Sequence, residues 1–98
     1  MNSCSNHIIF AEYLEELAKH SRKIGNMRGL DNGFVELQKL RARIERNGDR
    51  YFGIGAYRKL VAIAILLEND YREAIELNRR VKEIEKEHRK QNRQREVA

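Results

Sequence analysis

The chain has 98 residues, which suffices for one domain and is too short to divide into two that each bury a core. Hydrophobic residues make up 41% and charged residues 36%, which excludes a disordered chain, and the absence of proline disfavours a loop-rich β fold. The net charge is +5, but residues 39–59 carry +5, residues 60–78 carry −3 and the last twenty carry +4. These features predict a small all-α protein with an acidic stretch between two basic ones.

The sequence contains a single cysteine, Cys4, so an internal disulfide is excluded and a reducing compartment is favoured. The start of the chain lacks the basic and apolar regions of a secretory signal. The longest apolar run, residues 60–67, is far shorter than the ~20 residues that span a bilayer. We therefore predict a cytoplasmic protein that does not bind membranes.

A polar segment at the start, residues 1–6, is predicted to be a disordered N-terminal tail, and residues 7–84 are predicted to form a single helical domain. In the first helix of this domain, acidic residues precede basic ones, as the helix dipole favours. Gly25 is predicted to end this helix. Its apolar residues recur at helical spacing and are Phe10, Tyr13, Leu14, Leu17 and Ile24.

A loop at residues 26–33, rich in turn-forming residues, separates the first helix from a second one over residues 34–46. The dipeptide Asn47-Gly48 is predicted to end this second helix. Its buried stripe consists of Phe34, Leu37, Leu40 and Ile44.

A third helix is predicted over about residues 56–68, after a connector at residues 49–55. The run from Leu60 to Leu67 is apolar on every side, so neighbours must cover it on every side. Two or three helices of one short chain do not suffice for this, which predicts a homodimer. The candidate dimerisation residues, here and further along the chain, are Val61, Ile65, Leu77, Val81 and Ile84.

Asp70 and Glu73 form the pattern of a capping box, so a fourth helix is predicted to begin at Tyr71. Residues 85–98 are polar almost throughout and are predicted to be a solvated or extended C-terminal helix or tail. The predicted fold is a small helical bundle of three main helices plus a long basic C-terminal helix. The seam of that fourth helix consists of Ala74, Leu77, Val81, Ile84 and His88.

The segment Asn69–Glu76, which joins the third and fourth predicted helices, resembles the turn and second-helix start of a tetratricopeptide repeat. The resemblance covers one repeat and implies a helical hairpin. Asn78 departs from the large apolar residue that the repeat has at this place, and the chain has no second copy. Repeat arrays need about three units to bury their faces, so the segment predicts only a generic helical hairpin.

No group of residues has the spacing of a catalytic or metal site. The histidines His7, His20 and His88 do not share a helical face as ligands, and none has an acidic residue placed to orient it. The segment 53–55 lacks the third glycine of a dinucleotide-binding loop and the lysine of a P-loop, so it predicts a turn that permits close helix packing. The carboxylates fit helix starts or solvated faces. We therefore expect no enzymatic activity, no metal and no cofactor.

The most informative pattern is a basic stripe in which Lys39, Arg43, Arg46 and Arg50 recur at steps of four, three and four. Arginine binds phosphates and carboxylates alike, and aromatic residues beside arginine are typical of interface hot spots. The candidate residues for binding a protein partner or a nucleic acid are Lys39, Arg43, Arg46, Arg50, Tyr51, Tyr57, Arg58 and Lys59.

Two classes of function remain open. The first is a small non-catalytic regulatory or adaptor protein that binds a protein partner with an acidic surface, as an inhibitor or accessory subunit of a larger intracellular machine. The second is a DNA- or RNA-binding protein that uses the same basic face and the basic C-terminal helix. The first is preferred, because the loop before the second helix is too long for a helix-turn-helix and the tail mixes both signs of charge.

Overall fold

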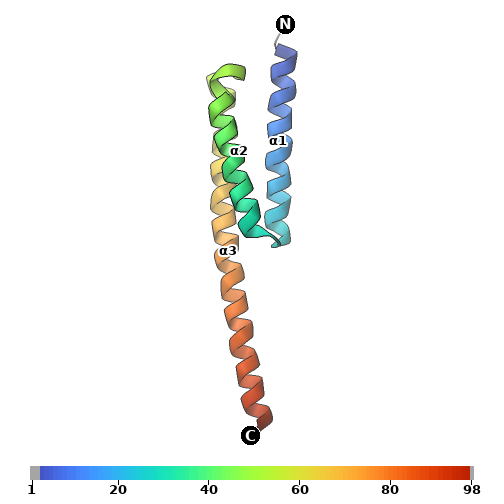
Figure 1. Ribbon diagram of the computed structural model, residues 1–98, viewed down its shortest axis with the longest axis vertical. Helices are drawn as coiled ribbons and strands as arrows, with labels where there is room; N and C mark the ends of the chain where they lie inside the picture. Colours follow the sequence, from blue (N-terminus) through green and yellow to red (C-terminus); the bar gives the residue numbers. More distant parts are fainter. Residues whose placement is uncertain (1–2, 98) are drawn as a thin grey trace.

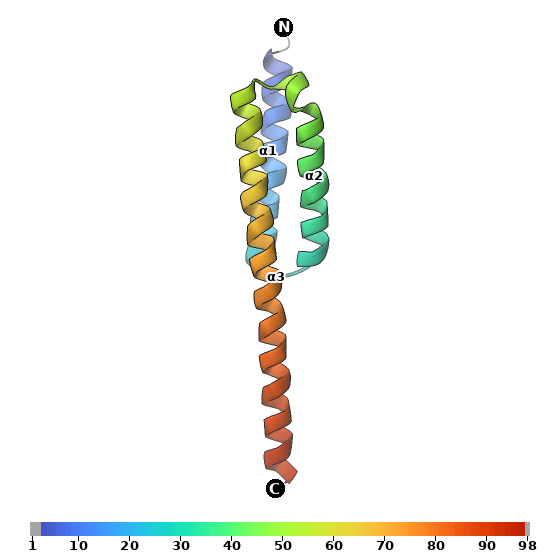
Figure 2. The same cartoon turned by 90° about the vertical axis from the view of Figure 1, so that its left-hand side faces the viewer.

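The computed structural model describes the chain from Ser3 to Val97, and within it the side chains of residues 7–48 and 52–91. The described residues form three helices and no strand: α1 (Ser3–Asn26), α2 (Leu30–Tyr51) and α3 (Ile54–Val97). The prediction of an all-α fold is therefore confirmed. α2 runs antiparallel to the other two helices, and the C-terminal part of α3 projects beyond them (Figures 1 and 2). The molecule is elongated, with extents of 77 × 16 × 16 Å.

α1 is longer than its predicted range at both ends. It begins at Ser3, inside the segment predicted to be a tail, while residues 1–2 lie outside the described residues. Short polar residues are compatible with a first helical turn, because its N–H groups have no intrahelical partner to lose. At the other end Gly25 remains helical, and the left-handed residue that closes the helix is Met27, whose N–H donates to the Ile24 carbonyl at 3.1 Å.

The connection between α1 and α2 is shorter than the predicted loop at residues 26–33. α2 begins at Leu30, directly after the left-handed Gly29, because Leu30 is buried and packs into the core. Gly33 lies within the helix and makes no turn. A Cβ atom at this position would lie 2.6 Å from Tyr71 Oη, so the glycine permits the close approach of α2 and α3.

The predicted end of the second helix at Asn47-Gly48 is wrong, because α2 continues to Tyr51. Gly48 is buried within the helix, and the ring of Tyr57 occupies the place where its Cβ atom would lie. The close helix packing that was expected at residues 53–55 is therefore found at Gly48, while both glycines of that segment face open space. The chain reverses at Phe52, whose N–H donates to the Gly48 carbonyl at 3.0 Å.

The third and fourth predicted helices are one continuous helix, α3. There is no turn at residues 69–70, so the helical hairpin that the tetratricopeptide resemblance implied is absent. The physical reason is the core: Leu67, Tyr71 and Ala74 are all buried and continue a single stripe through the segment. Asp70 and Glu73 match the pattern of a capping box, but the helix continues through them. There is therefore no helix end at this place whose N–H groups they could cap.

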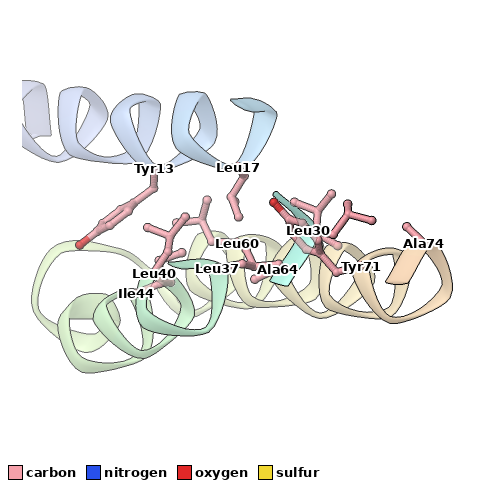
Figure 3. Packing of buried hydrophobic residues seen from close by; sticks show 11 residues of the cluster. Tyr13, Leu17, Leu30, Leu37, Leu40, Ile44, Leu60, Ala64, Tyr71 and Ala74 are labelled. Carbon is pink, nitrogen blue, oxygen red and sulfur yellow. The ribbon is translucent and has the colours of Figure 1, made fainter. Parts of the chain in front are cut away.

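The core lies where the three helices run side by side (Figure 3). α3 contributes core residues from Leu60 to Ala74. Among the described residues, the largest fully buried side chain is that of Tyr71. At the end opposite the projecting helix, the rings of Phe10 and Tyr13 contact the Phe52 ring edge-on, with centroids 5.8 and 6.0 Å away. The buried hydrophobic residues are Tyr13, Leu17, Leu30, Leu37, Leu40, Ile44, Leu60, Ala64, Leu67, Tyr71 and Ala74.

Candidate binding groove between α1 and α2

A groove of about 600 Å³ lies between the adjacent faces of α1 and α2. α1 contributes residues from about two turns, between Glu16 and Lys23, and α2 contributes the face that carries Lys39, Arg43 and Arg46. We call it the basic groove. Its lining residues are Glu16, Lys19, His20, Lys23, Glu36, Lys39, Leu40, Ala42, Arg43 and Arg46.

Both carboxylates of the basic groove join α1 to α2. Lys23 Nζ on α1 donates to Glu36 Oε2 at 3.0 Å, and Arg43 Nη2 on α2 donates to Glu16 Oε2 at 3.2 Å. The hydrogen bond from Lys23 is the main reason why the pKa of Glu36 is lowered from its ordinary value. Both pairs are largely exposed, so each contributes little to the stability of the fold.

Three cations of the basic groove form no ion pair with any side chain that the structure describes. They are Lys19 on α1 and Lys39 and Arg46 on α2, and all three are exposed. Lys39 and Arg46 are seven residues apart, so they lie two turns and roughly 10 Å apart on one face of α2. With five cations and two carboxylates along its walls, the groove carries an excess of three positive charges.

The floor of the basic groove is apolar or neutral. Leu40 is buried there, beside His20, which is 7% exposed. His20 Nδ1 and Tyr71 Oη share a hydrogen bond of 2.6 Å, which joins α1 to α3 beneath the groove. Burial and the nearby Lys23 lower the pKa of His20, so its ring is neutral at pH 7 and adds no charge to the walls.

This arrangement suits the recognition of an anionic surface that also presents apolar side chains. Exposed cations on two walls attract carboxylates or phosphates, and an apolar floor favours burial of a side chain between them. Among the side chains that the structure describes, no three histidine, cysteine or acidic residues gather as metal ligands would. The groove itself contains no serine, threonine or cysteine that a base could activate.

The structure brings together only part of the predicted binding set. Lys39, Arg43 and Arg46 lie in the basic groove. Tyr57 is half-buried against Gly48. Its ring therefore packs α2 on α3 and is not displayed for a partner. The exposed residues of α3 in that set, Arg58 and Lys59, do not line the groove, and the side chains of Arg50 and Tyr51 lie outside the described residues.

Two contributions to the site were missed at the level of sequence. Lys19 and Lys23 complete the groove from α1, and their spacing of four residues is a signal for one helical face, although only the fold shows that this face meets α2. The second contribution is the buried His20, which was not among the predicted binding residues. Its position three residues after Leu17 continues the buried stripe of α1, and this signal could have identified it.

One buried ion pair also departs from expectation. Glu68 is one of the carboxylates predicted to lie at a helix start or a solvated face. It is 4% exposed and accepts a hydrogen bond of 2.8 Å from Arg41 Nε. Arg41 also donates to Glu45, one turn further along α2, at 3.2 Å. The hydrogen bond to Glu68 raises the pKa of Arg41. This guanidinium takes part in the α2–α3 contact and does not line the basic groove.

The predicted dimerisation residues fall on two different faces of α3. Leu77, Val81 and Ile84 are 55%, 41% and 67% exposed. Ile65 is also exposed, but it lies about 100–120° around the helix from Leu77 and Ile84. Val61 is half-buried and packs against the core.

Comparison of the chain with protein-family models, with curated protein sequences and with solved structures found no match. Among the described residues, none of the helices is both long enough and apolar enough to cross a membrane.

Proposed function

We infer that this protein is a non-catalytic binding protein of the adaptor or regulatory type, and that its basic groove holds an acidic, partly apolar segment of a protein partner. The observation that supports this most is the set of three exposed cations, Lys19, Lys39 and Arg46, which lie around an apolar floor and form no ion pair with a described carboxylate. We place the activity in the cytoplasm, as the single cysteine predicts.

A protein segment fits the basic groove better than a nucleic-acid backbone does. Glu16 and Glu36 stand on opposite walls, where they would repel a continuous row of phosphates. A helical or extended peptide places carboxylates only at intervals, so it can meet Lys39 and Arg46 while an apolar side chain rests on Leu40. The groove therefore favours a partner whose acidic and apolar residues alternate at helical spacing.

Nucleic-acid binding is the second candidate, and one specific observation favours it. Lys39, Arg43 and Arg46 share one exposed face of α2, as their spacing predicted. A basic helical face of this kind contacts phosphates without regard to sequence. Its affinity would fall steeply with salt, whereas binding that also buries apolar side chains depends less on salt.

The test compares two double variants that remove the same charge from different places. Lys39→Glu/Arg46→Glu alters the basic groove, and Arg58→Glu/Lys59→Glu alters exposed residues outside it. The probes are a labelled amphipathic peptide of glutamate and leucine, a labelled single strand and a labelled DNA duplex, each followed by fluorescence anisotropy across a salt series.

We expect the groove variant to raise the Kd for the peptide by about tenfold or more, and the control variant to change it by less than about twofold. Equal losses in both variants, or no peptide binding by the wild-type chain at ~100 mM salt, would overturn the proposal. If the single strand or the duplex binds more tightly than the peptide, and the groove variant loses this binding, the second candidate would be established instead.

A further inference from the structure

The projecting part of α3 carries apolar side chains that no other part of the described chain covers. Leu77, Val81 and Ile84 are 55%, 41% and 67% exposed, and every described side chain from residue 79 to residue 91 is exposed. In both views this segment stands clear of α1 and α2 (Figures 1 and 2). Residues 79–97 extend for roughly 28 Å at 1.5 Å per residue.

The uncovered side chains form one stripe along the helix. At about 100° per residue, Leu77, Val81, Ile84 and His88 fall within an arc of roughly 60°, and Asp70 lies in line with them. The steps from Leu77 onward are four, three and four, which is the spacing of a coiled-coil seam. We call these five residues the α3 stripe.

We propose that the α3 stripe is covered by the α3 stripe of a second copy of the chain, in antiparallel orientation. The two-fold axis of the pair passes between Val81 and Ile84, so that Val81 of each copy packs against Ile84 of the other. The same register places Leu77 opposite His88. The proposal does not depend on the basic groove, which is lined by α1 and α2 alone.

The distribution of charge selects the antiparallel orientation. Residues 70–76 carry a net charge of −2, and residues 89–95 carry +4. In the antiparallel register each acidic segment lies beside the basic segment of the other copy. In a parallel pair each segment would lie beside the same segment of the other copy, with Asp70 facing Asp70 and His88 facing His88 along the seam.

A second feature of charge supports the same register. Arg80 and Glu87 lie on one flank of the α3 stripe, within roughly 20° of each other. In an antiparallel pair this flank meets the same flank of the other copy, so Arg80 faces Glu87 twice by symmetry. Glu87 has no ion pair with any described side chain, and Arg80 contacts Glu76 of its own helix at 3.3 Å. The surface is therefore complementary to itself.

Dimerisation would give the protein two basic grooves on one particle. Because the α3 stripe shares no residue with the basic groove, both grooves stay available when the copies pair. A partner with two acidic segments would then bind far more tightly than to a single copy, since the second contact becomes intramolecular.

The first experiment measures mass by sedimentation equilibrium over a wide range of protein concentration. Leu77→Glu/Ile84→Glu introduces two negative charges into the α3 stripe at exposed positions, and Ile65→Glu introduces one on another exposed face of α3 as the control. We expect the double variant to raise the dimer Kd by about 100-fold or more and the control by less than about threefold. Circular dichroism checks that both variants remain helical.

Two outcomes would overturn the proposal at this stage. One is a wild-type chain that is monomeric at every concentration. The other is a dimer that survives Leu77→Glu/Ile84→Glu, or one that Ile65→Glu disrupts equally.

Charge reversal and cross-linking then test the orientation. Arg80→Glu and Glu87→Arg should each weaken the dimer by about tenfold, and the combination of both should restore it, because Arg80 and Glu87 face each other only in the antiparallel register. In a Cys4→Ser background, chains with Leu77→Cys and chains with His88→Cys should form a mixed disulfide. A disulfide between two His88→Cys chains alone would show a parallel pair and overturn the antiparallel proposal.

Discussion

The two parts of α3 differ in how far the rest of the described chain covers them. From Ile54 to about Glu76 it packs beside α1 and α2, and its stripe of Leu60, Leu67 and Tyr71 is fully or almost fully buried. From Arg79 onward every described side chain is exposed, although apolar residues continue at helical spacing. The comparison teaches that helical periodicity identifies a face to be covered and does not identify which element covers it.

The largest expected difference between the two parts comes from removing apolar side chains. Leu60→Ala should lower the free energy of unfolding by about 3 kcal/mol, because it leaves a cavity among α1, α2 and α3. Ile84→Ala should change it by less than about 0.5 kcal/mol, since the side chain is exposed in the single chain. Urea unfolding at a protein concentration that keeps the chain monomeric measures both. Equal losses would mean that the projecting part of α3 is packed against its own chain.

The second comparison concerns ion pairs of the same chemistry. Arg41→Ala should lower the free energy of unfolding by about 1–2 kcal/mol, because it leaves the buried Glu68 carboxylate without its partner. Arg79 also contacts two carboxylates, Glu76 and Glu83, both at 2.6 Å, but all three side chains are largely exposed. Arg79→Ala should therefore have no measurable effect on urea unfolding. A loss of stability as large as that of Arg41→Ala would contradict the conclusion that these exposed ion pairs do not stabilise the fold.

Helix glycines give a third comparison, in which the two variants should change stability in opposite directions. Gly33→Ala should destabilise the fold by about 1 kcal/mol despite the better helix propensity of alanine, because the new Cβ atom lies 2.6 Å from Tyr71 Oη. Gly55→Ala in the first turn of α3 meets open space and should stabilise the fold by a few tenths of a kcal/mol. Thermal unfolding of both variants decides this. Stabilisation by Gly33→Ala would show that α2 and α3 can move apart at little cost.

The smallest expected effect is a dependence of stability on pH. Burial lowers the pKa of His20 below its ordinary value of 6.5, so between the two values the unfolded chain binds more protons than the folded one. The stability that neutral His20 contributes is therefore present above about pH 6.5 and is lost as the pH falls through the lowered pKa. Urea unfolding at several pH values should show this slope in the wild-type chain, and His20→Gln should flatten it. An unchanged slope in His20→Gln would assign the dependence to other groups.

Local spacing was enough to predict much of the fold. The stripes of α1 and α2, the helical state of residues 60–67 and the shared face of Lys39, Arg43 and Arg46 all follow from periodicity within one helix. Such features depend on neighbours three or four residues away, so sequence analysis identifies them well. The ends of the helices were predicted less well, because Gly33 and Gly48 were interpreted as turns.

The helical state, the basic face of α2 and the apolar spacing that continues along α3 can all be predicted from the order of residues along the chain. The packing of the three helices explains why Gly33 and Gly48 lie inside helices, because a distant aromatic ring occupies the space beside each of them. It also decided that Lys19 and Lys23 join the face of α2, that Arg41 reaches Glu68, and that Leu77 and Ile84 remain uncovered. The physical reason is the same throughout. Helix formation is governed by neighbours in sequence, whereas burial and charge pairing are governed by residues that only the fold brings together.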